Sequence, residues 1–204
     1  MGNIDFRTGD LTGKLGGLVG ARWKQSPYTR RYVVPANPRS DGQMAVRDSW
    51  AFLVAIGRRI NSTVLKLFTL PKPKAMSAFN RFMQINKWFI DTHPDIYESV
   101  KISEGGLYIL PITSIVASEA TGTVVVNWPV TMQGEAKVDD IAIIIVLNDT
   151  RDSYGFSTVV ERSVGTASVV LDGVATDEVH VWMFFVQGTE LASISKYEGG
   201  EYVA

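Results

Sequence analysis

The spacing of hydrophobic and polar residues changes twice along this chain, and each change marks the boundary of a predicted element. Residues 1–39 show no helical period, because glycine and proline interrupt short strand-like runs on either side of a candidate turn at Gln25–Tyr28. Apolar residues then recur at helical steps, and from Ile102 onward they recur at every second position. The sequence therefore predicts an α+β protein with three parts: an extended basic arm or β-hairpin over 1–39, a helical hairpin over 40–100 and an antiparallel β-sandwich over 101–204.

The middle part carries start and stop signals for two helices. Ser40 with Gln43 fits a capping box, and apolar residues at steps of three and four follow it, which predicts a helix over about 41–68. Two prolines close that helix, and a second helical pattern covers about 75–90. The two segments together predict the helical hairpin.

Seven strand-like runs separated by turn residues make up the last part. They lie at 107–117, 122–130, 140–148, 155–163, 167–173, 178–188 and 191–199. Runs of this number and spacing predict a β-sandwich of the immunoglobulin or fibronectin type III kind. Trp128 follows Val124 and Val126 at two-residue steps, so we expect it on the buried face as the core anchor.

Two of these runs are apolar on both faces, although a sandwich strand normally buries one face and exposes the other. Every residue from Ile141 to Leu147 is apolar, and both faces of Val179–Val186 are largely apolar. An apolar outer face needs a cover, which can be the chain's own helices or arm, a second copy or another protein. We therefore expect the helical hairpin or a neighbouring subunit to pack there, and we predict partner-binding positions on this sheet face: Ile143, Ile145, Trp182 and Phe184.

Charge is distributed unevenly along the chain. Residues 1–74 hold 13 Lys/Arg and 4 Asp/Glu (net +9), residues 75–100 hold 2 and 3 (net −1), and residues 101–204 hold 5 and 14 (net −9). This polarity fits contact with nucleic acid or a membrane surface, head-to-tail contact between subunits, or two separately solvated surfaces. The basic part interleaves cations with aromatics, and its predicted partner-binding residues are Arg22, Trp23, Lys24, Arg30 and Arg31.

Little in the sequence points to catalysis or to a cofactor. The absence of cysteine excludes thiolate chemistry and cysteine-ligated metals, and His93 and His180 fall in separate predicted parts, so we interpret both as structural. Gly9–Leu15 approaches a phosphate-binding loop but lacks its spacing and its Ser/Thr. We predict no catalytic, cofactor-binding or metal-binding residue. We recognise no signal peptide and no apolar run long enough to span a membrane, so we expect a protein made in the cytoplasm.

Several short segments together resemble a known family, an uncharacterised group of bacterial proteins classed as a domain of unknown function. The resemblance rests on five segments: 13–16 (GKLG), 19–24 (VGARWK), 37–40 (NPRS) with Gln43, 77–80 (SAFN) and 193–197 (SISKY). It implies an extended basic N-terminus, helices and a fibronectin-like C-terminal domain, and it implies no activity. Fibronectin domains carry a corner tyrosine in the last-but-one strand, and 177–185 has none, so we expect a variant sandwich or one that lacks an edge strand.

These patterns favour a non-enzymatic structural protein, a subunit or decoration of a larger particle such as a phage virion. Such a protein would dock through its N-terminal arm and the apolar sheet face, with other proteins or copies of itself as partners. One alternative is a glycan- or surface-binding module that uses the β-sandwich, with Trp182 or Tyr154 as the aromatic platform. Another is nucleic-acid contact through the basic N-terminus.

Overall fold

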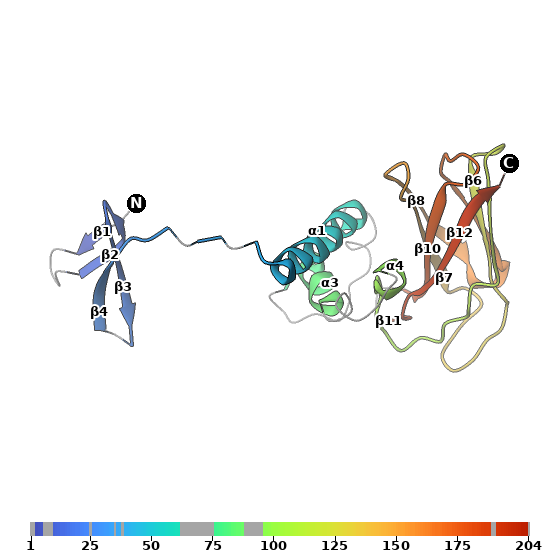
Figure 1. Cartoon of the computed structure of the whole chain (residues 1–204). Coiled ribbons are helices and arrows are strands. Elements are labelled where there is room, and N and C mark those ends of the chain that lie inside the picture. The colour runs from blue at the N-terminus through green and yellow to red at the C-terminus, as the bar shows by residue number, and fades with distance from the viewer. Residues whose placement is uncertain are drawn as a thin grey trace. The chain divides into compact units, whose positions relative to one another are not determined.

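The computed structural model describes residues 3–5, 10–24, 26–34, 36–37, 39–61, 76–87, 96–188 and 191–203, and Figure 1 shows its elements. The chain divides into two compact units, Met1–Ala45 and Val46–Ala204. The second unit contains most of helix α1 (Asp41–Asn61) and all the later elements.

The first unit is an antiparallel four-stranded sheet whose strands follow one another in chain order. These strands are β1 (Asn3–Asp5), β2 (Asp10–Leu15), β3 (Leu18–Trp23) and β4 (Ser26–Arg31). Trp23 pairs with Ser26, so the chain reverses direction between these two residues, and Lys24 adopts a φ of 44° there. The predicted turn at Gln25–Tyr28 is therefore wrong, because Ser26 and Pro27 already belong to β4.

Two helices of the second unit pack closely on one another. The predicted first helix is confirmed over the described residues as α1, and the second is α3 (Ala78–Asn86), capped by the Ser77 hydroxyl, which accepts a hydrogen bond from the Asn80 amide at 3.1 Å. Gly57 permits the approach, because a Cβ atom there would lie 2.8 Å from Phe79 Cε2 and 3.0 Å from Phe82 Cε1. The predicted continuations over 62–68 and 88–90 lie outside the described residues. A short helix, α4 (Ile96–Ser99), leads into the strands.

All seven strand-like runs contribute strands, and the last run contributes two. The strands are β5 (Ser114–Ser118), β6 (Thr123–Asn127), β7 (Ile141–Asn148), β8 (Ser153–Glu161), β9 (Thr166–Val170), β10 (Glu178–Gln187), β11 (Leu191–Ala192) and β12 (Lys196–Val203). They form one sheet in the order β8-β7-β10-β12-β5-β6-β9, with β11 paired to β10 and a parallel step between β12 and β5. The sheet curls until β8 approaches β9, since a Cβ atom on Gly155 would lie 2.6 Å from Val169 Cγ1. The unit is thus sandwich-like and nearly closed into a barrel.

The inside of this curled sheet holds the first apolar core. Trp128 is buried there, its ring meets Phe185 edge-on, and its indole N–H donates to the Arg162 carbonyl at 3.0 Å, which confirms it as a core anchor. Asp140 and Arg162 form a fully buried ion pair, with Arg162 Nε donating to Asp140 Oδ2 at 3.1 Å. Burial lowers the pKa of the Arg162 guanidinium, and the neighbouring Asp140 carboxylate opposes that shift.

A second apolar core covers the outer face of β7 and β10. It joins three residues of α1 (Leu53, Ile56 and Ile60) and two of α3 (Phe82 and Met83) to Ile143, Ile145, Leu147, Trp182, Phe184 and Val186. Of the two expected covers, the chain's own helices are therefore the one that the structure confirms. The prediction that Ile143, Ile145, Trp182 and Phe184 bind a partner is wrong, because all four side chains are buried within this core. Trp182 is also excluded as a glycan platform, whereas Tyr154 is partly exposed.

A tyrosine from a different strand compensates for the missing corner residue. Tyr202 of β12 is buried, and its hydroxyl donates a hydrogen bond to the Leu171 carbonyl in the β9–β10 connection. Gly173 leaves room for the ring, since a Cβ atom there would overlap it. Strands from all seven predicted runs pair into the sheet, so none of these runs is lost from an edge.

Candidate functional site in the N-terminal sheet

The strand register sorts the side chains of the N-terminal sheet onto two faces. Directly paired residues share a face and successive residues alternate, so the pairs Trp23–Ser26, Ala21–Tyr28 and Val19–Arg30 lie on the same side. Lys14 pairs with Val19 and joins this side, and Tyr32 follows two residues after Arg30. We call this side the aromatic face and define it by Lys14, Trp23, Tyr28, Arg30 and Tyr32.

The aromatic face exposes large side chains to an unusual degree. Trp23 is 70% exposed, Tyr28 45% and Tyr32 40%. The ammonium group of Lys14 lies 3.6 Å from the centroid of the Tyr32 ring, in cation–π geometry. Small side chains such as Ala21 separate the large ones, so the face presents rings and cations across a shallow surface.

The five residues predicted in this segment do not form one patch. Trp23 and Arg30 lie on the aromatic face, whereas Arg22 and Arg31 lie on the opposite face, and Lys24 sits in the turn with its ammonium group 5.9 Å from the Trp23 ring centroid. The split follows from the register of β3 and β4, because side-chain direction alternates along each strand.

Sequence reasoning did not assign Lys14 and Tyr28 to this site. The sequence pattern puts Tyr28 in the predicted turn, whereas the structure has it in β4. Lys14 belongs in sequence to the segment that approaches a phosphate-binding loop, whereas the structure has it in β2 directly opposite Val19. The missing signal was the register: a turn placed between Trp23 and Ser26 aligns Tyr28 and Arg30 with Trp23 on one face.

The N-terminal sheet lacks a hydrophobic core in the part of it that can be described. Across 12–24 and 26–34, Gly20 is the one buried residue, and every residue of β4 is exposed. Between residues 10 and 34 the sequence holds five Lys/Arg and a single acidic residue, Asp10. A small sheet needs a hydrophobic face or a packed neighbour for independent stability, and the cations here would favour an acidic neighbour.

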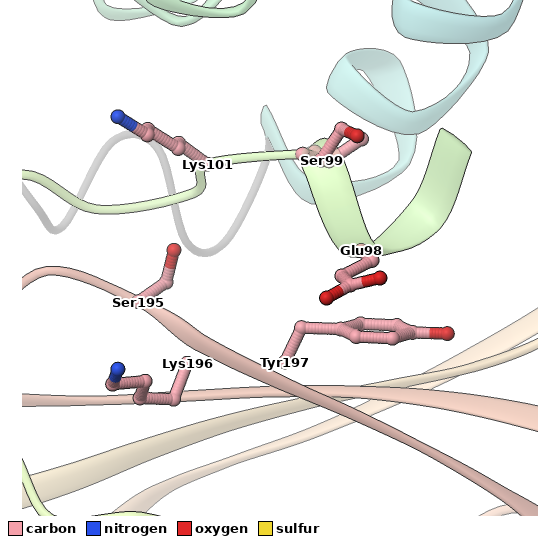
Figure 2. Close-up of a pocket in the computed structure, with 7 residues that line it drawn as sticks. Glu98, Ser99, Lys101, Ser195, Lys196 and Tyr197 are labelled. Carbon is pink, nitrogen blue, oxygen red and sulfur yellow. The ribbon is translucent and has the colours of Figure 1, made fainter. Parts of the chain in front are cut away.

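A polar cleft in the second unit is a further candidate site, and Figure 2 shows its lining. The cleft has a volume of about 340 Å³ and lies between α4 and the start of β12, lined by Glu98, Ser99, Val100, Lys101, Ser195, Lys196 and Tyr197. Two ammonium groups and a carboxylate at such a cleft suit a small polar molecule. The Ser195 hydroxyl, however, already accepts a hydrogen bond from the Ile102 amide at 3.0 Å, which gives this lining a structural role.

The histidine that the structure describes belongs to an aromatic cluster under α4. His180 is buried, its ring stacks on Tyr97 with centroids 3.7 Å apart, and its Nδ1 lies 2.9 Å from the Tyr197 hydroxyl. Burial, reinforced by the hydrogen bond and charge of Asp149, raises the pKa of Tyr97. His180 thus holds α4 on the sheet, while His93 lies outside the described residues.

No group of three or more His, Asp or Glu side chains is placed to hold a metal ion within the described ranges. In the same ranges, no helix has the length and apolar character needed to cross a membrane.

Fold and site together define a small α+β protein in which a basic, aromatic sheet precedes a helix-covered, sandwich-like unit. The chain belongs to a family of unknown function, DUF6266, whose sequence profile matches residues 10–199. This confirms the resemblance to an uncharacterised domain family. A search of curated proteins finds no match.

Similarity to solved structures covers about half of this chain. A family 76 glycoside hydrolase from a bovine Bacteroides thetaiotaomicron strain is similar over 46% of this chain and 20% of its own, at 14% identity and a TM-score of 0.33. A computationally redesigned β-sandwich protein is similar over 48% of this chain and 88% of its own, at 11% identity and a TM-score of 0.32. The chain spans about a fifth of the hydrolase's length.

Proposed function

We propose that this chain is a non-enzymatic assembly protein that joins a larger particle by docking its N-terminal sheet on an acidic protein surface. The observation that carries the proposal is the aromatic face, which exposes Trp23, Tyr28 and Arg30 on a sheet that buries almost nothing. Tryptophan, tyrosine and arginine are the residue types that dominate binding energy at protein interfaces. The helix-covered unit serves as the rigid body that the sheet attaches.

The strand order supports a related proposal about the rigid body. Four strands (β8-β7-β10-β12) and three strands (β5-β6-β9) would form the two layers of a fibronectin type III-like sandwich, with the first and last strands side by side. One fold hosts many unrelated functions, so the assembly role rests on the aromatic face and not on this architecture.

Single-stranded nucleic acid is the main competitor for the aromatic face, since bases stack on aromatic rings between phosphate-binding cations. The geometry favours protein, because the Lys14 ammonium group lies over the Tyr32 ring and so occupies a stacking position. Acidic side chains of a partner can instead pair with Lys14 and Arg30 while apolar side chains contact Trp23 and Tyr28.

The test is the native mass of the protein in its source cells and particles, for the wild type and for Trp23→Ala. We expect the wild type in an assembly of defined, larger mass and the variant largely released from it. Val33→Ala is the matched control, because Val33 is equally exposed but follows the strands and lies outside the aromatic face. A monomeric wild type in every fraction, or tight binding of a single-stranded oligonucleotide that Trp23→Ala abolishes, would overturn the proposal.

A further inference from the structure

One end of the sandwich gathers acidic side chains from four chain segments. Glu119 lies in the β5–β6 turn, Asp172 in the β9–β10 connection, Glu178 at the start of β10 and Glu201 near the end of β12. Hydrogen bonds tie these segments together, since the Glu119 amide donates to the Val203 carbonyl at 3.0 Å and the Ala175 amide donates to the Glu119 carboxylate at 2.8 Å. We call these four residues the acidic end.

The charges of the acidic end are crowded and weakly compensated. Glu178 and Glu201 are direct cross-strand neighbours, an arrangement in which like charges destabilise a sheet. Within 96–188 and 191–203, none of the four carboxylates takes part in an ion pair, whereas the nearby Asp177 pairs with Arg151. Burial, followed by the charges of Asp172 and Asp177, raises the pKa of Tyr202 beneath this end. A cationic partner would relieve this repulsion.

Exposed apolar side chains accompany the acidic residues. Val170, Val174 and Val203 are exposed: Val170 ends β9, Val174 lies in the same β9–β10 connection as Asp172, and Val203 ends β12, the strand of Glu201. The acidic end therefore has carboxylates next to apolar side chains. Its carboxylates complement the cations of the aromatic face, and its apolar side chains complement the aromatic rings.

We propose that the aromatic face of one copy docks on the acidic end of a second copy. This inference rests on the proposed function and deepens it by naming the partner surface. Two aromatic faces would repel through Lys14 and Arg30, and two acidic ends would repel through their carboxylates, so like surfaces do not pair. The contact is consequently heterologous, and repeated head-to-tail contacts build a ring or an open filament.

Charge reversal on each surface tests the contact in the full-length chain. Arg30→Glu disables the aromatic face, and Glu201→Lys disables the acidic end. In sedimentation velocity at low salt, the mass of the wild-type assembly should increase with protein concentration and decrease with added salt. The self-association constant of each variant should be at least about tenfold lower than that of the wild type. Mixing the two variants should produce a 1:1 dimer that does not grow, because the mixture contains one intact pair of surfaces.

Two matched controls keep the charge change and move its position. Arg31→Glu alters the opposite face of the same strand, and Glu135→Lys alters an exposed loop residue that precedes β7. Both should assemble like the wild type. Tyr28→Ala leaves the charge unchanged and should also weaken assembly. It tests the aromatic face independently, in case Arg30→Glu weakens assembly only through a folding defect.

Three results would overturn this inference. A strictly monomeric wild type at all concentrations excludes a second copy as the partner. Assembly that Glu201→Lys leaves intact places the docking surface elsewhere on the chain. A mixture of the two variants that stays monomeric excludes the pairing of these two surfaces. In each case the proposed function survives if Trp23→Ala still releases the protein from its native assembly, and it fails as well if that variant changes nothing.

Discussion

Replacing Arg162 by methionine is expected to destabilise the second unit more than almost any other single substitution. Arg162 and Asp140 are both fully buried, and Arg162 also donates from Nη2 to the Tyr108 carbonyl at 2.9 Å. Its guanidinium lies 3.7 Å from the ring centroid of Phe185, where methionine would retain apolar contact but no charge. The substitution leaves the Asp140 carboxylate buried without its countercharge.

The size of the effect follows from that unpaired carboxylate. Breaking a buried ion pair by removing one partner costs about 3–5 kcal/mol. The Tyr108 carbonyl also loses its charged donor, which adds roughly 1–3 kcal/mol if no water replaces it. Asp140 keeps hydrogen bonds from Gln187 Nε2 at 3.0 Å and the Lys137 amide at 2.9 Å, so we take the lower part of the combined range, about 4 kcal/mol. That loss is a large share of the stability of an ordinary domain.

Urea unfolding followed by tryptophan fluorescence measures this change, and a double-mutant cycle tests its cause. Arg162→Met should lower the urea midpoint strongly, and adding Asp140→Leu to it should recover much of the loss, because no buried charge then remains. Arg58→Met, at an exposed position of α1, should change stability by less than about 0.5 kcal/mol. A cost below about 1 kcal/mol for Arg162→Met, or no recovery in the double variant, would refute the reasoning.

Three further substitutions test other contacts. Gly57→Leu should lower the melting temperature through a loss of about 1–3 kcal/mol, because its side chain collides with the buried Phe82 ring. Gly173→Ala should also lower the melting temperature, since its Cβ atom displaces the Tyr202 ring from its hydrogen bond. Hydrogen bonds from Asn148, the Val174 amide and Arg151 lower the pKa of Asp177. The Asp177 carboxylate therefore contributes its whole stabilisation above the pKa of an unfolded aspartate, about 4, and loses it as the pH falls through the lower pKa of the folded state. The gap in melting temperature between wild type and Asp177→Asn should therefore shrink from pH 7 to pH 3.

The glycine predictions have matched controls. Gly42→Ala in α1 and Gly106→Ala before the strands meet open space, so neither should lower the melting temperature. If Gly57→Leu or Gly173→Ala behaves like these controls, the close packing inferred at that glycine is wrong. A stability gap for Asp177→Asn that does not change with pH would show that the carboxylate's charge contributes nothing.

Periodicity predicted most of the second unit because each element has a continuous local signal. The helical pattern of α1 and the two-residue alternation of the strands each extend over several residues, and burial of one face selects that pattern. Tyr202 shows where this approach stops. Its role depends on contact with Leu171, 31 residues away, and the local sequence carries no signal for that contact.

The candidate site was harder to predict than the fold, for a reason that one turn illustrates. Whether Tyr28 lies beside Trp23 depends on the register of β3 and β4, and a shift of one residue reverses every side chain. A strand with a buried face fixes its register by hydrophobicity, but all of β4 is exposed. The sequence therefore showed that the segment is basic and aromatic but not which of its residues share a face.

The apolar outer face of β7 and β10 shows how a strong sequence signal can lead to a wrong partner. The signal itself was sound, because an apolar sheet face must be covered, but it does not say by what. The answer lay in the adjacent helical pattern: Leu53, Ile56 and Ile60 form an apolar stripe that would be exposed without the sheet. The apolar stripe of α1 and the outer face of β7 and β10 bury each other within one chain, so neither needs a second molecule as a cover. The described residues of the N-terminal sheet offer no such complement, and for that reason we propose that the sheet, rather than the sandwich face, is where a partner docks.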